Sequence, residues 1–184
     1  MRMRGGLIAV VIACLLLGWW LAHPPVTLPR PEASAIPGCP LPPRVPRGDP
    51  PLQTDAPSGL SLPAIGGATL SPLAGFSVEA RVLGREDYRL GREAEFSPTD
   101  LALGWGRMAD DTVLAQLDIS QGGRWYRYRW QDQPPIPADE IARSSANMHI
   151  VPANDAVAAA LGRVEAGQRL RIDGWLVRID ADDG

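Results

Sequence analysis

The sequence predicts an α+β fold: a small curved β-sheet or partly open OB-like barrel with two or three short helices, preceded by a transmembrane helix and a Pro-rich linker. Three observations support it. An uncharged apolar run lies near the N-terminus, a cluster of prolines follows it, and the back half alternates strand-like segments with short helical patterns. A strand with a central glycine and a helix between strands are typical of OB-like barrels, but this analogy carries no function.

Residues 1–22 are predicted to be a transmembrane signal anchor. Arg2 and Arg4 precede an uncharged, mostly apolar run over residues 5–22, close to the ~20 residues that cross a bilayer core. A cleaved signal peptide and lipidation at Cys14 are the alternatives, but Trp20 stands where cleavage after Ala22 needs a small residue. The arginines keep the N-terminus in the cytoplasm. The inner membrane is thus the expected partner, and the rest of the chain lies in the periplasm or outside the cell.

Residues 23–70 are predicted to be a disordered Pro-rich linker. Twelve of the 19 prolines fall between Pro24 and Pro57, and prolines remove backbone donors where few large apolar side chains intervene. Such a chain rises about 3.1 Å per residue when extended, so it would serve as a stalk. Cys39 lies within it and is expected to be a solvent-exposed free thiol or to form an intermolecular disulfide.

Residues 71–184 are the predicted extracytoplasmic α+β domain. Residues 73–184 carry thirteen arginines against eighteen acids, a balance that disfavours general nucleic-acid binding because phosphate attraction needs a basic face. Nucleic acid is therefore an unlikely partner. We predict no metal site, because the only histidine of this domain, His149, has no second His or Cys at ligand spacing. No cofactor is expected.

Several short elements are expected in the first part of this domain. Residues 76–83 alternate as a half-buried strand, whose inner face would hold Phe76, Val78, Ala80 and Val82. Residues 84–95 predict turns or a hairpin, and residues 97–100 a turn ending at Asp100. A short helix should follow over residues 111–117, with a strand over 112–119 as the competing interpretation.

Two runs hold the aromatic candidates. Gly104 and Gly106 bracket Trp105 and permit φ > 0 or a close backbone approach there. Its indole is expected to plug the core, with a ligand platform as the second interpretation. In the run GRWYRYRW at residues 123–130, aromatic and basic side chains interleave on a predicted strand after a glycine turn. They could stack bases or sugars, or form a barrel wall with cation-π support, which we favour. The candidate ligand-binding residues here are Arg124, Trp125 and Tyr128.

Residues 139–151 hold the only group with catalytic potential. A short helix is expected from Asp139, and a strand over residues 147–151 places Asn147 and His149 on one face, with Met148 and Ile150 on the other. The candidate catalytic residues are His149, Ser145, Asn147 and Asp139, with Ser144 as a second possible nucleophile. We favour a structural role for His149, and keep Asn147 and His149 as candidate ligand-binding residues.

The C-terminal part predicts a capped helix and a final strand. Asn154 or Asp155 should cap a helix over residues 156–161 that ends at Gly162. Residues 169–179 alternate as a strand with Gly174 as a bulge or bend, its apolar positions being Leu170, Ile172, Leu176 and Ile179. The closing Asp-Gly predicts a hairpin turn without a returning strand. An envelope protein partner would then complete the open edge of this strand, or the domain is C-terminally truncated, which we favour.

Three blocks, DLALGWGRM (residues 100–108), LDISQGGRWY (117–126) and SANMHIVPANDAV (145–157), resemble an uncharacterised family of bacterial proteins with a membrane-anchored or secreted N-terminus. The resemblance covers about residues 76–180 and implies no established activity. It implies that the motif residues belong to one common site or core: Trp105, Gly106, Ser145, Asn147, His149 and Pro152. Family members continue with a Trp- and Ser-rich strand pair that this chain lacks.

Three functions remain open on these grounds. The leading one is a membrane-anchored, non-catalytic binding or assembly module outside the cytoplasm. The alternative is an envelope hydrolase or lyase that uses His149 with Ser144 or Ser145. The third is single-stranded nucleic-acid binding through an OB-like face carrying Trp125, Tyr128 and Arg129.

Overall fold

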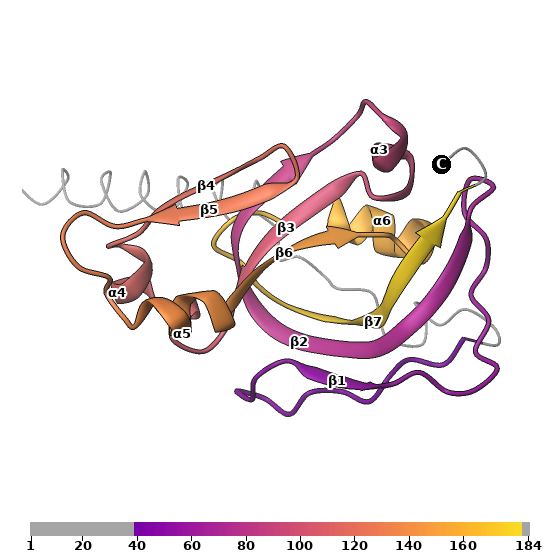
Figure 1. The fold of residues 1–184 in the computed structure, drawn as a ribbon, viewed down its shortest axis with the longest axis horizontal. Helices are drawn as coiled ribbons and strands as arrows, with labels where there is room; N and C mark the ends of the chain where they lie inside the picture. Colours follow the sequence, from indigo (N-terminus) through magenta and orange to yellow (C-terminus); the bar gives the residue numbers. More distant parts are fainter. Residues whose placement is uncertain (1–38, 182–184) are drawn as a thin grey trace, which may run out of the picture.

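The computed structural model describes residues 39–181, which form an α+β fold with a mostly antiparallel sheet and a few short helices (Figure 1). The predicted membrane span at residues 5–22 lies outside this part of the chain. Among the described helices, none is long and apolar enough to cross a bilayer. The elements follow in the order β1 (Leu52–Asp55), β2 (Thr69–Asp87), α3 (Arg92–Phe96), β3 (Thr99–Gly104), the 3-10 turn η1 (Gly106–Ala109), α4 (Asp111–Leu114), β4 (Asp118–Gly122), β5 (Trp125–Arg129), α5 (Ala138–Arg143), β6 (Ser145–Ile150), α6 (Asp155–Leu161) and β7 (Arg169–Asp180).

The long strand β2 organises the sheet. Its residues 74–77 pair with β1 on one edge and with β7 on the other. Further along the edge that carries β1, residues 81–87 of β2 pair with β3. The other edge of β3 pairs with β6. The described strands form a strongly curved sheet that does not close into a barrel. β4 and β5 form a separate hairpin that projects from one end of the sheet together with α4 and α5 (Figure 1).

The curvature comes from β2 itself. The pairing register shifts between Pro72 and Ala74 opposite β7, and between Val82 and Gly84 opposite β3. Each shift bends the strand, as β-bulges do. The predicted bulge at Gly174 is wrong, since Gly174 pairs in regular register with Phe76. Turns or a hairpin were predicted over residues 84–95: β2 and β3 do form an antiparallel hairpin, but β2 continues to Asp87 before the connection begins.

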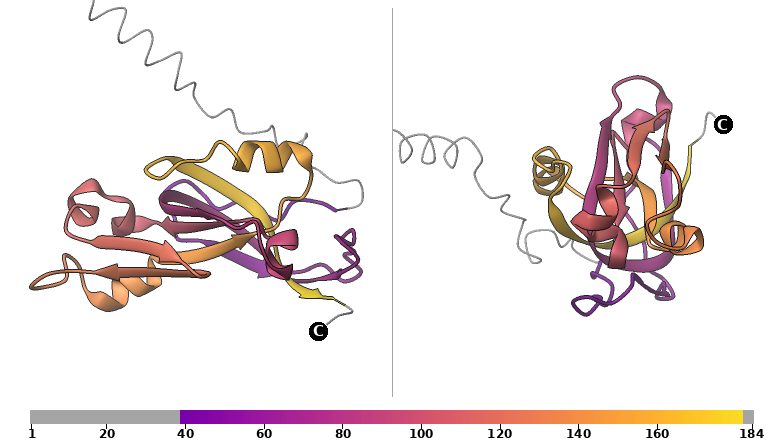
Figure 2. Two further views of the ribbon diagram at one scale, coloured as in Figure 1. Left: turned by 90° about the horizontal axis from the view of Figure 1, so that it is seen from above. Right: turned by 90° about the vertical axis from the view of Figure 1, so that its left-hand side faces the viewer.

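The main core lies on the concave face of the sheet. The alternation predicted for residues 76–83 is confirmed, because Phe76, Val78, Ala80 and Val82 are all buried there. Leu101 and Leu103 from β3 and Leu161 from α6 complete this core. Burying each such large side chain contributes about 1.5–3 kcal/mol. The predicted cap of α6 is confirmed, since Asn154 Oδ1 accepts a hydrogen bond from Val157 N at 3.0 Å, and Figure 2 shows this helix against the sheet.

A second, smaller core lies beneath the β4–β5 hairpin. Met108, Val113, Ile136 and Ile141 are buried there, and Tyr128 and Trp130 pack against them from β5 and the residue after it. The helix predicted over residues 111–117 is shorter than expected, because α4 covers only Asp111–Leu114 before β4 begins at Asp118. This core joins α4, α5 and the hairpin into one layer.

Residues 39–70, within the segment predicted as a disordered linker, are packed on the domain. β1 pairs with β2, Val45 is 2% exposed, and Val45 N donates to Ser77 Oγ at 2.8 Å. Cys39 is buried rather than solvent-exposed. Proline-rich chain can occupy such a place because an extended segment at the edge of a sheet needs few backbone donors. The domain thus begins well before residue 71.

β7 is fully paired along one edge. All of its residues from Arg169 to Asp180 lie in antiparallel register with β2, so the strand needs no returning partner to be held. The expectation that it lies unpaired is therefore wrong. Its second edge pairs with no strand among residues 39–181. The predicted Asp-Gly turn at residues 183–184 lies outside the described residues.

Candidate functional site

Asp100 is the centre of a buried polar cluster. It lies opposite His149 in the β3–β6 register and is 0% exposed. Asp100 Oδ1 accepts a hydrogen bond from Arg124 Nη1 at 2.7 Å and lies 2.8 Å from His149 Nδ1, and Oδ2 accepts a hydrogen bond from Asn147 Nδ2 at 3.2 Å. A fully buried carboxylate needs such donors to remain stable. We call Asp100, Gln121, Arg124, Asn147 and His149 the Asp100 cluster.

Arg124 enters this cluster from the tip of the hairpin. Gly123 and Arg124 connect β4 to β5 with φ values of 59° and 67°, the two-residue turn with positive φ at both positions that suits a twisted hairpin. A positive φ is unfavourable for a long side chain. Arg124 is held there because Nη1 also donates to the Ser97 carbonyl at 2.9 Å and the guanidinium lies 3.8 Å from the centre of the Tyr88 ring. Arg124 therefore clamps the hairpin onto the sheet and is not a free ligand-binding residue.

Asn147 is also fully engaged. Besides its bond to Asp100, its Nδ2 donates to the Arg124 carbonyl at 3.1 Å, and its Oδ1 accepts from Gln121 Nε2 at 2.8 Å. The hairpin comes close to β2 at this point, because a Cβ placed on Gly84 would lie 2.7 Å from Gln121 Oε1. The prediction that Asn147 and His149 share a face is confirmed. The contacts of Asn147 indicate a positioning role.

His149 differs from the rest of the cluster because its side chain is 53% exposed. Its Nδ1 lies 2.8 Å from Asp100 Oδ1, and the other ring nitrogen, Nε2, has no hydrogen-bond partner among the described residues. A carboxylate that orients a histidine in this way is a common feature of general bases. Sequence reasoning paired His149 with Asp139, and the structure places Asp100 in that position.

The structure does not bring the other predicted catalytic residues to His149. Ser145 lies four strand residues away on β6, a distance of about 13 Å, and its hydroxyl donates to the Ile141 carbonyl at 2.7 Å. Ser144 lies one residue further, at the end of α5. Asp139 is on α5, where it pairs with Arg143 at 2.7 Å. Ser145 and His149 lie on the same strand, β6, but the rise along the strand separates their side chains.

The aromatic candidates have different environments. Trp105 packs against the main core. The glycines beside it show the predicted close backbone approach and positive φ: a Cβ on Gly104 would clash with the Met108 carbonyl oxygen, and Gly106 has φ 54°. This supports a core plug. Tyr128 turns inward and stacks on Trp130 with ring centres 6.2 Å apart. Trp125 is 68% exposed, so it alone of the three presents its ring to solvent.

Two titratable groups near the hairpin have shifted pKa values. Burial raises the pKa of the Tyr126 hydroxyl above its ordinary value, because the phenolate would lose its solvation. On α5, hydrogen bonding from Arg107 lowers the pKa of the Glu140 carboxyl. This second pair joins η1 to α5. The lowered pKa of Glu140 favours the packed arrangement near neutral pH, where the Tyr126 hydroxyl stays uncharged.

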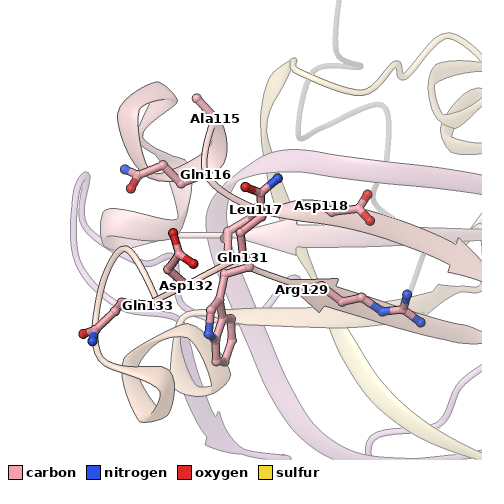
Figure 3. Close-up of a pocket in the computed structure, with 9 residues that line it drawn as sticks. Ala115, Gln116, Leu117, Asp118, Arg129, Gln131, Asp132 and Gln133 are labelled. Atoms are coloured by element: carbon pink, nitrogen blue, oxygen red, sulfur yellow. The ribbon is translucent and has the colours of Figure 1, made fainter.

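A groove that sequence reasoning missed lies between the end of α4 and the loop after β5 (Figure 3). It is lined by Ala115, Gln116, Leu117, Asp118, Arg129, Trp130, Gln131, Asp132 and Gln133. Within residues 39–181, no hydrogen bond or ion pair engages the side chains of Asp118, Arg129 or Asp132. The sequence signal for this groove is the polar run Gln131-Asp132-Gln133 directly after an aromatic strand.

Within the part of the chain that the structure describes, no group of three or more His, Cys, Asp or Glu residues is placed to hold a metal ion. Comparison of the chain with protein-family models, with curated proteins and with solved structures finds no match. Evidence on function therefore comes from the sequence and from the geometry of this chain.

Proposed function

We propose that this chain is a non-catalytic binding or assembly module, held outside the cytoplasmic membrane by its N-terminal anchor. The observation that carries the proposal is how the Asp100 cluster uses its polar groups. Asp100, Arg124 and Asn147 hold the hairpin on the sheet, and among residues 39–181 no serine, threonine or cysteine forms a hydrogen bond with His149. Covalent catalysis needs a nucleophile within about 2.6–3.2 Å of its base.

The rigid hairpin supports a binding role. Its tip is fixed by Arg124 and its inner face by the stack of Tyr126, Tyr128 and Trp130, whose successive ring centres lie 5.6 and 6.2 Å apart. A surface that is already ordered loses little conformational entropy when a ligand binds. The curved sheet, with α6 between β6 and β7, also supports the likeness to a partly open OB-like barrel, a fold that binds oligonucleotides and oligosaccharides.

The proposed anchor sets the reach of the domain. Residues 23–38 connect the proposed span to the first residue that the structure describes. If extended, this length corresponds to about 50 Å at ~3.1 Å per residue. The proposed module would therefore act close to the membrane surface, at about a third of the ~150 Å that an extended linker over residues 23–70 would allow.

The hydrolase or lyase alternative is kept because of one observation. The exposed ring of His149 lies beside a fully buried carboxylate, with Nδ1 2.8 Å from Asp100 Oδ1, so it could activate water or a hydroxyl supplied by a substrate. The position of Tyr128 argues against the nucleic-acid alternative, because this side chain faces the second core and cannot stack on a ligand beside Trp125. Absence of oligonucleotide binding at low ionic strength would remove it.

Replacement of His149 by alanine separates the two main functions. The variant should keep its melting temperature, because Arg124 and Asn147 still donate hydrogen bonds to Asp100. A binding module should show no loss of turnover when purified wild type and His149→Ala are incubated with envelope extracts and the products are followed by mass spectrometry. Turnover by the wild type that collapses in a stable His149→Ala protein would show that the chain is an enzyme. Asp139→Ala is the matched control, because Asp139 lies on α5 and does not touch His149.

A further inference from the structure

The groove at the end of the hairpin combines flat polar side chains with an indole. Gln131, Asp132 and Gln133 come from the loop after β5, and Gln116 faces the groove from the end of α4 (Figure 3). The side-chain amide of Gln116 donates from Nε2 to the Thr112 carbonyl at 2.8 Å, which fixes it and leaves Oε1 as an acceptor. Trp130 lines the same groove while stacked on Tyr128. Such donors and acceptors can bind the hydroxyl groups of a polyhydroxylated ligand.

The groove continues onto the outer face of β5. Along this strand Trp125, Arg127 and Arg129 are exposed, while Tyr126 and Tyr128 between them are half-buried. Residues that alternate on a strand lie about 6.8 Å apart, so the exposed face from Trp125 to Arg129 extends about 14 Å. Arg129 belongs to both surfaces. The two therefore form one continuous track.

Arg127 and Arg129 on this track stand opposite Ser120 and Asp118 of β4. No ion pair engages Arg127 or Arg129 within residues 39–181. Trp125 stands opposite Gly122 on β4, and a Cβ on that glycine would meet nothing within 4 Å, so one side of the indole has no neighbouring side chain to cover it. An exposed aromatic face with neighbouring guanidinium groups suits a ligand that offers apolar ring faces and anionic groups.

We propose that this track binds an anionic glycan of the cell envelope. Asp118, Asp132 and the glutamine side chains hydrogen-bond to its hydroxyls, and Trp125 packs against the apolar face of a sugar ring. Arg127 and Arg129 bind its carboxylate or phosphate groups, because the guanidinium fork matches both geometries. The proposal rests on the proposed binding function and supplies its ligand class.

The test uses the full-length chain in detergent micelles and a fluorescent oligosaccharide of alternating glucuronic acid and N-acetylglucosamine. The wild type should bind this probe, and Arg129→Gln/Asp132→Asn should weaken binding at least about tenfold, because the double variant loses two charge-assisted hydrogen bonds to the ligand. Trp125→Ala should also weaken it. The matched control is Arg178→Gln, which removes an exposed arginine from β7 and should leave the affinity unchanged. All variants should keep the wild-type melting temperature.

Two further probes distinguish a glycan site from simple charge attraction. Polyglutamate of equal charge and vesicles containing phosphatidylglycerol should bind at least about tenfold more weakly than the oligosaccharide. Equal binding of either probe, full binding by the double variant, or no binding of the oligosaccharide by the wild type would overturn this inference. The proposed binding function would fall separately, through enzymatic turnover that depends on His149 or through a cytoplasmic location of the domain.

Discussion

Replacement of Asp100 by asparagine should be the most damaging conservative change in the domain. The substitution keeps the shape of a 0% exposed side chain but removes the charge that faces Arg124 at 2.7 Å and His149 at 2.8 Å. The Arg124 side chain is only 18% exposed. Breaking a buried pair by removing one partner costs about 3–5 kcal/mol, a large share of the ~5–15 kcal/mol that stabilises a typical domain.

Urea unfolding followed by tryptophan fluorescence measures this cost. A double-mutant cycle with Arg124→Gln should give a coupling energy of about 1.5–3 kcal/mol, because the two side chains are in direct contact. Asp139→Asn is the matched control, since it removes one partner of a solvent-exposed pair and should leave the unfolding midpoint unchanged. A loss below about 1 kcal/mol for Asp100→Asn, or an additive cycle, would refute the view that this carboxylate holds the hairpin on the sheet.

Two other changes test the N-terminal segment and the hairpin. Gly75→Ala should displace residues 39–55, because its Cβ would lie 2.4 Å from Thr54 Oγ1 and 2.7 Å from Pro42 Cβ. The rate at which a thiol reagent labels Cys39, measured in a Cys14→Ser background, should therefore rise. Gly122→Ala meets nothing within 4 Å and should leave that rate unchanged, and an unaltered rate in Gly75→Ala would show that the segment is not held there. Because burial raises the pKa of Tyr126 above its value in the unfolded chain, its contribution to stability is complete below the unfolded pKa and is lost as pH rises through the folded pKa. The wild type should therefore lose more stability than Tyr126→Phe between pH 9 and 11 in urea unfolding, and identical losses would contradict the shift.

Local patterns predicted the elements whose burial depends on their own periodicity. The inner face of β2, the two faces of β6 and the capped helix α6 all follow from side-chain alternation or from a single capping residue. In each of these, the residue types within a few positions determine which side faces the core. The glycines around Trp105 belong to the same class, because their geometric requirement is local.

Asp100 escaped prediction because its environment is not local. It follows Ser97, Pro98 and Thr99, and such a sequence is typical of an exposed turn. Its burial depends on Arg124 and on Asn147, 24 and 47 residues further along the chain. One signal was present in the sequence: Arg124 occupies the second position of a tight hairpin turn, where a small residue is usual. A long side chain in that position indicates a tertiary contact that compensates for the unfavourable φ.

The start of the domain was predicted at residue 71, too late in the chain, because proline-rich composition shows only that a segment cannot form a core of its own. Prolines argue against an independent core, but they do not prevent an extended chain from packing on a surface that another segment provides. Gly75 leaves the space for that packing on β2, and Ser77 accepts the hydrogen bond of Val45 N. Only the pairing of residues separated by 19 to 25 positions in the chain reveals this arrangement.

The location of the domain is the point on which the proposed function most directly depends. Alkaline phosphatase, which needs disulfide bonds to fold, can be fused after Gly184, with green fluorescent protein in the same position as the matched control. We expect phosphatase activity in intact cells from the first fusion and no fluorescence from the second, because residues 23–184 would lie outside the cytoplasm. Fluorescent cells without phosphatase activity would place the domain in the cytoplasm and contradict the proposed function.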